Sequence, residues 1–419
     1  MQVGAWGAPV PASLLVAITA LLALRLLLFV GAAAVELARR RRLPWPLDGE
    51  LPRASVIVPA FNEERVLEGT VASLLASDHP DLEIILVDDG STDATATLAR
   101  ALADRHPRVR LLLRPANGGK SAALNAGIAV ATGAHIVTVD ADTLLHPRAL
   151  RRLCAPLVLP GVDAVASNVK VGNRQRWINV WQSLEYVVGL NLHRRGQAAL
   201  GCITTIPGAA CAFRREALAE VGGFSSDTVV EDTDLTLCLL EAGKRIVFQP
   251  TAVAYTESPD TIGGLFRQRT RWARGYFQCL WKHRRSFFRR DVLGWFGMPD
   301  LLLVNVLFYG LVPLSLPALG SLLGAASAGT VSWGALAGGV AGLFAVDLAV
   351  AAGAYTIDGE DLRELRHVPL RQLVWPWFLL AVFVVAAWRF LSGARGWGTP
   401  ARQGVLAEAG KGGKTGVVR

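Results

Sequence analysis

Short apolar runs alternate with amphipathic segments between residues 54 and about 250. The apolar runs have the length of buried strands and cover residues 55–58, 83–87, 109–113 and 135–139. The segments between them have the apolar spacing of helices and cover residues 63–76, 92–105 and 120–131. Strands that alternate with helices predict βαβ units and a mostly parallel sheet. The expected fold class is α/β, with ligands bound beyond the carboxyl ends of the strands.

Longer apolar segments flank this region. Ala12–Val35 holds 24 residues, and a bilayer requires about 20. Leu301–Val346 contains no charged residue over 46 positions, enough for two spans with a turn near Gly329. A further span begins with Leu373–Trp388, and the polar segment before it, Asp358–Arg371, suggests an interfacial helix. The pattern predicts four spans around the α/β region.

These boundaries divide the chain into five regions. They are an N-terminal membrane anchor over 1–38, a cytosolic catalytic domain over 50–260, a basic interfacial helix over 261–292, a C-terminal membrane region over 298–393 and a tail over 394–419. Arginines follow the first apolar run at residues 39–42, so the positive-inside rule places the N-terminus outside and the α/β domain in the cytosol. The expected location is the inner cell membrane. If the four spans cross the membrane in alternating directions, the tail lies outside the cell. Its Lys and Arg residues, however, favour the cytosolic side.

Composition and charge support a membrane enzyme. Hydrophobic residues are 52% of the chain and the mean hydropathy is +0.36, both high for a soluble enzyme. The net charge is +9. Nine Lys and Arg residues, with no Asp or Glu, lie between Arg267 and Arg290. This cluster and Arg39–Arg42 lie beside apolar runs, which favours contact with anionic lipid, and no nucleic-acid-binding motif is present.

Acidic side chains follow the predicted strands. Asp140 and Asp142 come directly after the run 135–139, and carboxylates with substrate phosphates are the usual ligands of Mg²⁺. Asp89 follows the run 83–87 and is placed to accept hydrogen bonds from a base or ribose, although an Asx-turn would also explain it. The turn from Pro59 to Glu63 is a second candidate for holding a nucleobase, with helix capping by Asn62 as the alternative.

Three further motifs complete the candidate site. Asn117–Ser121 opens a helix with backbone NH groups and Lys120, which suits a diphosphate, but the loop lacks the spacing of an ATP-binding P-loop. Glu231 and Asp232 offer a general base for an acceptor hydroxyl, or else simply an acidic first helical turn. Gln268–Trp272 supplies Arg for a diphosphate and Trp for a sugar face, with an interfacial helix as the alternative.

These motifs, in this order, resemble the membrane-bound family 2 glycosyltransferases that polymerise sugars: the cellulose, hyaluronan and poly-N-acetylglucosamine synthases. The resemblance covers roughly residues 50–290 and rests on the QxxRW run with the upstream DxD and xED motifs. The segment from Asn168 to Phe224 looks most like the bacterial poly-β-1,6-N-acetylglucosamine synthases. Val230 replaces the usual Thr of the TED triplet. No regulatory domain for a cyclic dinucleotide is evident.

The resemblance implies a nucleotide-diphospho-sugar transferase (GT-A-like) fold and a role for each motif. Asp232 would be the catalytic base, with Glu231 beside it. Donor contacts would come from Pro59, Glu63, Asp89, Lys120, Asp140 and Arg271. Acceptor contacts would come from Gln268 and Trp272. The metal, Mg²⁺ or Mn²⁺, would be bound by Asp142 with Asp140.

We therefore expect an inverting, metal-dependent glycosyltransferase. It would transfer a sugar, N-acetylglucosamine by resemblance, from a UDP-sugar to a growing β-linked polysaccharide at the membrane, with room for a small membrane accessory subunit as a partner. A single transfer to a lipid acceptor is the second interpretation. A non-catalytic nucleotide-sugar sensor or export subunit is the third, and the intact acidic set argues against it.

Overall fold

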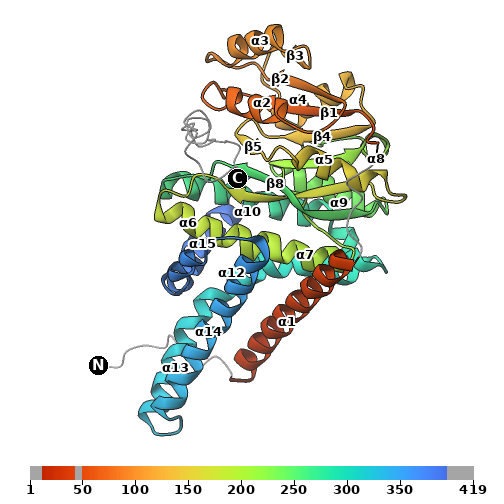
Figure 1. Cartoon of the computed structure of the whole chain (residues 1–419). Coiled ribbons are helices and arrows are strands. Elements are labelled where there is room, and N and C mark those ends of the chain that lie inside the picture. The colour runs from red at the N-terminus through yellow and green to blue at the C-terminus, as the bar shows by residue number, and fades with distance from the viewer. Residues whose placement is uncertain (1–11, 43–49, 394–419) are drawn as a thin grey trace.

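The computed structural model describes residues 12–42 and 50–393 (Figure 1). The expected outward N-terminus and the basic tail over 394–419 lie outside the described residues. All four predicted strands are confirmed, as β1 (Ala54–Ala60), β2 (Leu82–Asp88), β3 (Val109–Leu113) and β4 (His135–Val139). The predicted helices between them are also confirmed, with slightly later starts for the first two: α2 (Leu67–Leu75), α3 (Thr95–Arg105) and α4 (Lys120–Val130).

A second half of the domain extends the sheet. Its strands are β5 (Thr143–Leu145), β6 (Ala164–Val171), β7 (Ala210–Arg214) and β8 (Ile246–Thr256). Its helical elements are α5 (Ala149–Cys154), η1 (Ala155–Val158), α6 (Trp177–Leu184), η2 (Glu185–Leu192), α7 (His193–Ala199), α8 (Arg215–Glu220) and α9 (Glu231–Glu241). The eight strands form one sheet in the order β3-β2-β1-β4-β7-β6-β8-β5, and its antiparallel pairs are β4–β7, β6–β7 and β5–β8.

Alternation along the central strands builds a core on each face of the sheet. Val56 and Val58 of β1 pack with α2, α3 and α5, whereas Ile57 between them packs with α4, α9 and Phe213 of β7. Successive side chains of a strand point to opposite faces, so apolar residues at every position require helices on both. This double cover keeps the carboxyl ends of β1, β2 and β4 rigid, and the candidate motifs follow those ends.

Three helical segments beyond the domain are long and apolar enough to cross a membrane: Leu293–Ser327, Trp333–Asp358 and Leu362–Leu391. The first is broken into η4 (Leu293–Gly297), α11 (Met298–Leu302), η5 (Leu303–Leu307), α12 (Phe308–Leu311), η6 (Val312–Leu314) and α13 (Ser315–Ser327). The others contain α14 (Trp333–Asp358), η7 (Leu362–His367) and α15 (Val368–Leu391). In Figure 1, α13 and α14 extend away from the sheet, and α6 and α7 lie between these two helices and the sheet.

The segment between α14 and α15 differs from expectation. The interfacial helix predicted over Asp358–Arg371 does not form, because α14 continues to Asp358 and α15 begins at Val368. Only the short 3₁₀ helix η7 lies between them. Polar side chains of this segment are bonded to the α/β domain.

The N-terminal helix α1 (Ala12–Arg42) extends on the same side of the sheet as α13 and α14 (Figure 1). The side chains of its first turns lie outside the described residues, so the expected span there stays a prediction. Its Arg25 Nε lies 2.8 Å from Asp300 Oδ1, and His193 Nε2 lies 2.9 Å from Asp300 Oδ2. This ion pair joins α1 to α11 and α7, which is how a charge within an apolar helix is usually accommodated.

Candidate active site

One cavity with an empty volume of about 910 Å³ lies beside the ends of β4 and β8. Eight of the eleven residues predicted from the sequence line it: Lys120, Asp140, Asp142, Glu231, Asp232, Gln268, Arg271 and Trp272. They come from the start of α4, the end of β4, the first turn of α9 and the middle of α10 (Ile262–Lys282). The fold thus assembles motifs that lie up to about 150 residues apart in the sequence.

Lys120 links the acidic groups of the cavity. Its Nζ lies 2.6 Å from Asp140 Oδ1 and 2.9 Å from Glu231 Oε1. Gly119 precedes it with φ 86, a left-handed conformation that favours glycine. Burial lowers the pKa of Lys120, but the carboxylates of Asp140 and Glu231 outweigh burial and raise it above its usual range. The side chain is therefore a fixed positive charge at this end of the cavity.

Asp232 has the properties expected of a general base. Burial and the charge of Glu231 raise the pKa of Asp232 to about 6, although Lys120 opposes the shift. The backbone NH groups of Gly208 and Thr233 donate to its two oxygens at 3.0 and 2.7 Å. A carboxylate with a pKa near neutrality both ionises at physiological pH and accepts a proton readily.

The donor set fits a divalent metal. Five carboxylates and three cationic side chains line the cavity, an excess of two negative charges. Burial raises the pKa of Asp140 although the nearby ammonium of Lys120 opposes the shift, so a second cation beside Asp140 would favour its ionised form. Asp140 and Asp142 provide hard oxygen atoms, the ligand type of Mg²⁺ and Mn²⁺. The residues present are therefore suited to one divalent ion.

A second cluster with metal-binding residue types consists of Asp234, Cys238 and His283. His283 Nε2 lies 2.9 Å from Asp234 Oδ1, and its Nδ1 lies 2.8 Å from Glu241 Oε1. Burial lowers the pKa of His283, but hydrogen bonds to Asp234, Cys238 and Glu241 outweigh it and raise the pKa to about 11. These ion pairs join α9 to the residue after α10.

The QxxRW motif lies on α10, and its Trp272 ring stacks against the side chain of Arg269. The guanidinium of Arg269 lies 4.0 Å from the ring centroid of Trp272, and its Nη2 donates to Glu185 Oε2 at 2.6 Å. Gln268 Oε1 is buried and has no hydrogen-bond partner among the described residues. A buried amide oxygen without a donor is costly, and a hydroxyl group of a ligand would supply one.

Pro59, Glu63 and Asp89 do not line this cavity. Pro59 lies in the last part of β1, Glu63 lies in the turn after β1, and Asp89 directly follows β2. Asp89 is buried, forms an ion pair with Arg114, and accepts hydrogen bonds from the NH groups of Gly118 at 3.2 Å and Gly119 at 2.8 Å. Its carboxylate thus braces the loop that carries Lys120. A contact between these three residues and a nucleoside stays a prediction.

Several cavity residues were not predicted from the sequence. Tyr186, Arg194, Glu257 and Tyr276 all line it. Glu257 directly follows β8, so the strand-end rule that identified Asp140 could have identified it. Tyr186 and Arg194 lie on η2 and α7, whose helical pattern does not indicate which side faces a ligand. The π-helical form of η2 carries no sequence signal that we recognise.

Residues 52–275 match the family described as "Glycosyltransferase like family 2". The chain belongs to this family. It is 31% identical to the poly-beta-1,6-N-acetyl-D-glucosamine synthase of Staphylococcus aureus (strain COL) over 240 residues, which are 57% of each chain. The identity to the synthase of Staphylococcus epidermidis is also 31%, over 54% of this chain and 55% of that protein. The matches thus span little more than half the length of these relatives.

One solved structure matches nearly the whole chain. It is the mannosyltransferase PcManGT from Pyrobaculum calidifontis in complex with GDP-Man and Mn²⁺. The match has a TM-score of 0.56 and 26% identity, and it covers 88% of this chain and 97% of that one. The GT-A-like fold expected from the sequence is confirmed, and this family 2 protein is a glycosyltransferase.

Proposed function

We propose that this glycosyltransferase transfers N-acetylglucosamine from a UDP-sugar to a growing β-linked polysaccharide, with inversion at the anomeric carbon. The observation that carries the proposal is Asp232, whose pKa is raised to about 6 in a cavity that also holds Lys120 and the Asp140/Asp142 pair. The choice of sugar rests on the staphylococcal synthases. The donor site faces the cytosol in this proposal, and the apolar helices cross the inner membrane.

The transfer would proceed as a single displacement. The acceptor hydroxyl attacks the anomeric carbon while Asp232 takes its proton, so the acceptor O–H bond breaks as the new glycosidic bond forms. The bond between the anomeric carbon and the diphosphate oxygen breaks, and UDP leaves with the electron pair. Arg271, on the cavity wall, stabilises the charge that develops on the diphosphate.

Asp140 and Asp142 would hold the metal. A bound Mg²⁺ or Mn²⁺ supplies positive charge to the diphosphate of the donor. Lys120 orients Asp140 through its 2.6 Å contact and keeps the acidic cluster from repelling the donor. Gln268 and Trp272 would bind the acceptor, because they combine an unpartnered amide oxygen with an aromatic face.

The test is UDP release from membranes that contain the protein, with a panel of UDP-sugars, with and without Mn²⁺, and with sizing of the product. We expect metal-dependent turnover of UDP-N-acetylglucosamine into a long product. Asp232→Asn should abolish transfer and retain UDP binding, whereas the exposed, distant Asp104→Asn should match the wild type. An active Asp232→Asn enzyme would exclude Asp232 as the base.

The second candidate is transfer of one sugar to a lipid acceptor. The comparison with PcManGT, a mannosyltransferase in complex with GDP-Man whose match covers 88% of this chain, widens the range of donors to be tested for either candidate. GDP-Man therefore belongs in the donor panel. A product that ends at one lipid-linked sugar would replace the polysaccharide proposal with this one, and nucleotide binding without turnover of any donor would favour a sensor or export subunit.

A further inference from the structure

The α14–α15 connection carries a buried ionic network with the α/β domain. We propose that this connection, residues 358–364 (the hairpin loop), positions the acceptor side of the cavity. The proposal rests on the proposed function only in naming which side receives the acceptor. The network brings together three cationic side chains, Lys170, Arg174 and Arg195, and three acidic ones, Asp358, Glu360 and Glu364.

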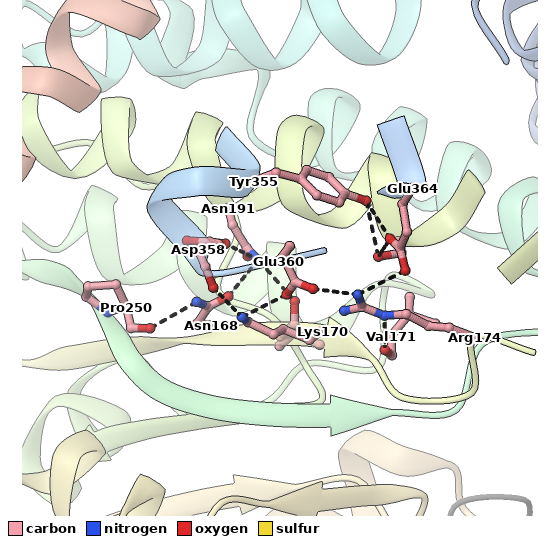
Figure 2. Close-up of polar contacts among 12 residues, drawn as sticks. Asn168, Lys170, Val171, Arg174, Asn191, Pro250, Tyr355, Asp358, Glu360 and Glu364 are labelled. Carbon is pink, nitrogen blue, oxygen red and sulfur yellow. Dashed lines mark hydrogen bonds and ion pairs between the residues drawn. The ribbon is translucent and has the colours of Figure 1, made fainter. Parts of the chain in front are cut away.

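The contacts of the network are short and shielded from water. Lys170 Nζ lies 2.8 Å from Glu360 Oε1 and also donates to the backbone oxygen of Asp358 at 2.8 Å. Arg174 is bonded to Glu360 as well, and lies 3.4 Å from Glu364 Oε1 (Figure 2). Arg195 Nη2 lies 2.8 Å from Asp358 Oδ1, and these side chains are 7% and 3% exposed. Removal of one partner from such a pair leaves an uncompensated buried charge.

Residues of the network, and two asparagines bonded to it, are next in sequence to residues that line the cavity. On β6, Asn168 and Lys170 flank Val169, which lines it. Asn191 follows the lining residue Leu190, and Arg195 follows the lining residue Arg194. Neighbouring residues of a strand point to opposite faces, so on β6 the hairpin loop holds the back of the strand whose front forms the cavity wall.

The π-helix η2 is one element that this network supports. π-helical turns are rare and are frequent at functional sites. Its Tyr186 and Leu190 line the cavity, whereas its Asn191 donates to Asn168 Oδ1 at 2.6 Å and to Asp358 Oδ2 at 3.3 Å (Figure 2). Val187 packs in an apolar cluster with Ala354 and Tyr355 of α14. The hairpin loop and α14 therefore supply part of the polar and part of the apolar backing of η2.

The donor side is independent of this support. In the part of the chain that the structure describes, the hydrogen bonds of the hairpin loop to the α/β domain end on β6, Arg174, α6, η2 and α7. None reaches Lys120, Asp140 or Asp232, which lie on α4, after β4 and on α9. Loosening of the hairpin loop should therefore weaken acceptor binding and leave donor binding intact.

The experiment uses the full-length enzyme reconstituted in lipid. Asp358→Asn keeps the size of the side chain but removes the charge that faces Arg195. Arg363→Gln is the matched control, because Arg363 lies in the same connection but is exposed. We would measure the KM of a soluble β-linked N-acetylglucosamine oligosaccharide, the KM of the donor, and hydrogen exchange over residues 185–192.

Asp358→Asn should raise the acceptor KM on the order of tenfold, because a displacement of about 1 Å in a positioning group has effects of this size or larger. The donor KM should stay within about twofold, and exchange over 185–192 should accelerate. Glu360→Gln keeps the Asp358 contacts and should raise the acceptor KM by a smaller factor. It replaces Asp358→Asn in the test if that variant does not fold.

Either of two results would overturn the proposal: donor and acceptor KM rising together, or both staying at the Arg363→Gln values with unchanged exchange over 185–192. If the wild-type enzyme does not use the oligosaccharide at all, the proposed function is at fault. The exchange measurement still decides the present proposal in that case, because it requires no substrate.

Discussion

Lys120 Nζ lies 2.6 Å from Asp140 Oδ1, so an ammonium group occupies the acidic site before any donor is bound. The same ammonium lies 2.9 Å from Glu231 and opposes the rise in the pKa of Asp232. One side chain thus joins the DxD motif to the motif of the base. The two motifs are separate in the sequence, but the positive charge of Lys120 acts on the carboxylates of both.

Replacement of Lys120 should change the pH dependence of transfer. Lys120→Met removes a positive charge that lowers the pKa of Asp232, so this pKa should rise further above 6. The acidic limb of the kcat/KM profile should move up by about one pH unit or more, whereas Lys120→Arg should move it less. Profiles measured at saturating metal test this. An unmoved limb in Lys120→Met would show that Asp232 does not produce it.

The ionisation of Asp232 should be visible in the wild-type enzyme. Because a base acts in its deprotonated form, kcat/KM should rise with pH through about 6 and level off above it. A profile that stays flat down to pH 4 would contradict the shift. A fall in activity that coincides with loss of near-UV circular dichroism would be unfolding, so both signals are recorded at each pH.

The same shift should appear in stability. The folded-state pKa of Asp232 lies above its ordinary value, so its ionisation destabilises the folded protein as pH rises from about 4 to about 6. Asp232→Asn removes this dependence. The melting temperature of the variant relative to the wild type should therefore increase across that pH window, even though transfer is lost. Thermal melts in detergent test the direction, with Asp104→Asn as the control.

Substitution of Asp89 can distinguish between two roles of its carboxylate, which are support of the loop before Lys120 and direct contact with the nucleoside. Its carboxylate bonds to Arg114 and to the NH groups of the loop before Lys120. If bracing is its role, Asp89→Asn and Arg114→Met should both raise the donor KM several-fold, without changing the preference for UDP over other nucleotides. Competition by UDP and GDP tests this. A changed nucleotide preference in Asp89→Asn alone would favour the direct contact implied by the family resemblance.

The sequence predicted the site well where residues follow strands. Asp140 and Asp142 come after a strand that is buried on both faces, and the carboxyl edge of a parallel sheet brings such positions together. The same pattern did not reveal Arg194 or Tyr186, because a helix residue enters a cavity only through tertiary packing. Nor did it reveal the pairing of Lys170 with Glu360, since Coulombic partners nearly two hundred positions apart leave no periodic signal. The sequence pattern therefore predicts an interfacial helix over Asp358–Arg371, where the structure has the hairpin loop.

Gly208 tests how closely the base must be held. A Cβ atom at this position would lie 3.0 Å from Asp232 Oδ2 and 3.2 Å from Lys120 Nζ. Gly208→Ala should push Asp232 away from the NH of residue 208, which now donates to it at 3.0 Å. We expect kcat to fall on the order of tenfold or more, because positioning of the base acts on the chemical step.

Donor binding provides the contrast in Gly208→Ala. UDP affinity should fall less than kcat, because the donor-side atom that the new methyl group meets is Lys120 Nζ at 3.2 Å, the end of a flexible side chain that can move aside. Gly263→Ala is a suitable control, since its new Cβ would meet only Arg267 at 3.6 Å, an ordinary contact distance. If Gly208→Ala turns over at the wild-type rate, the 3.0 Å hydrogen bond to Asp232 has no part in catalysis, and the NH of Thr233 is enough to orient the base.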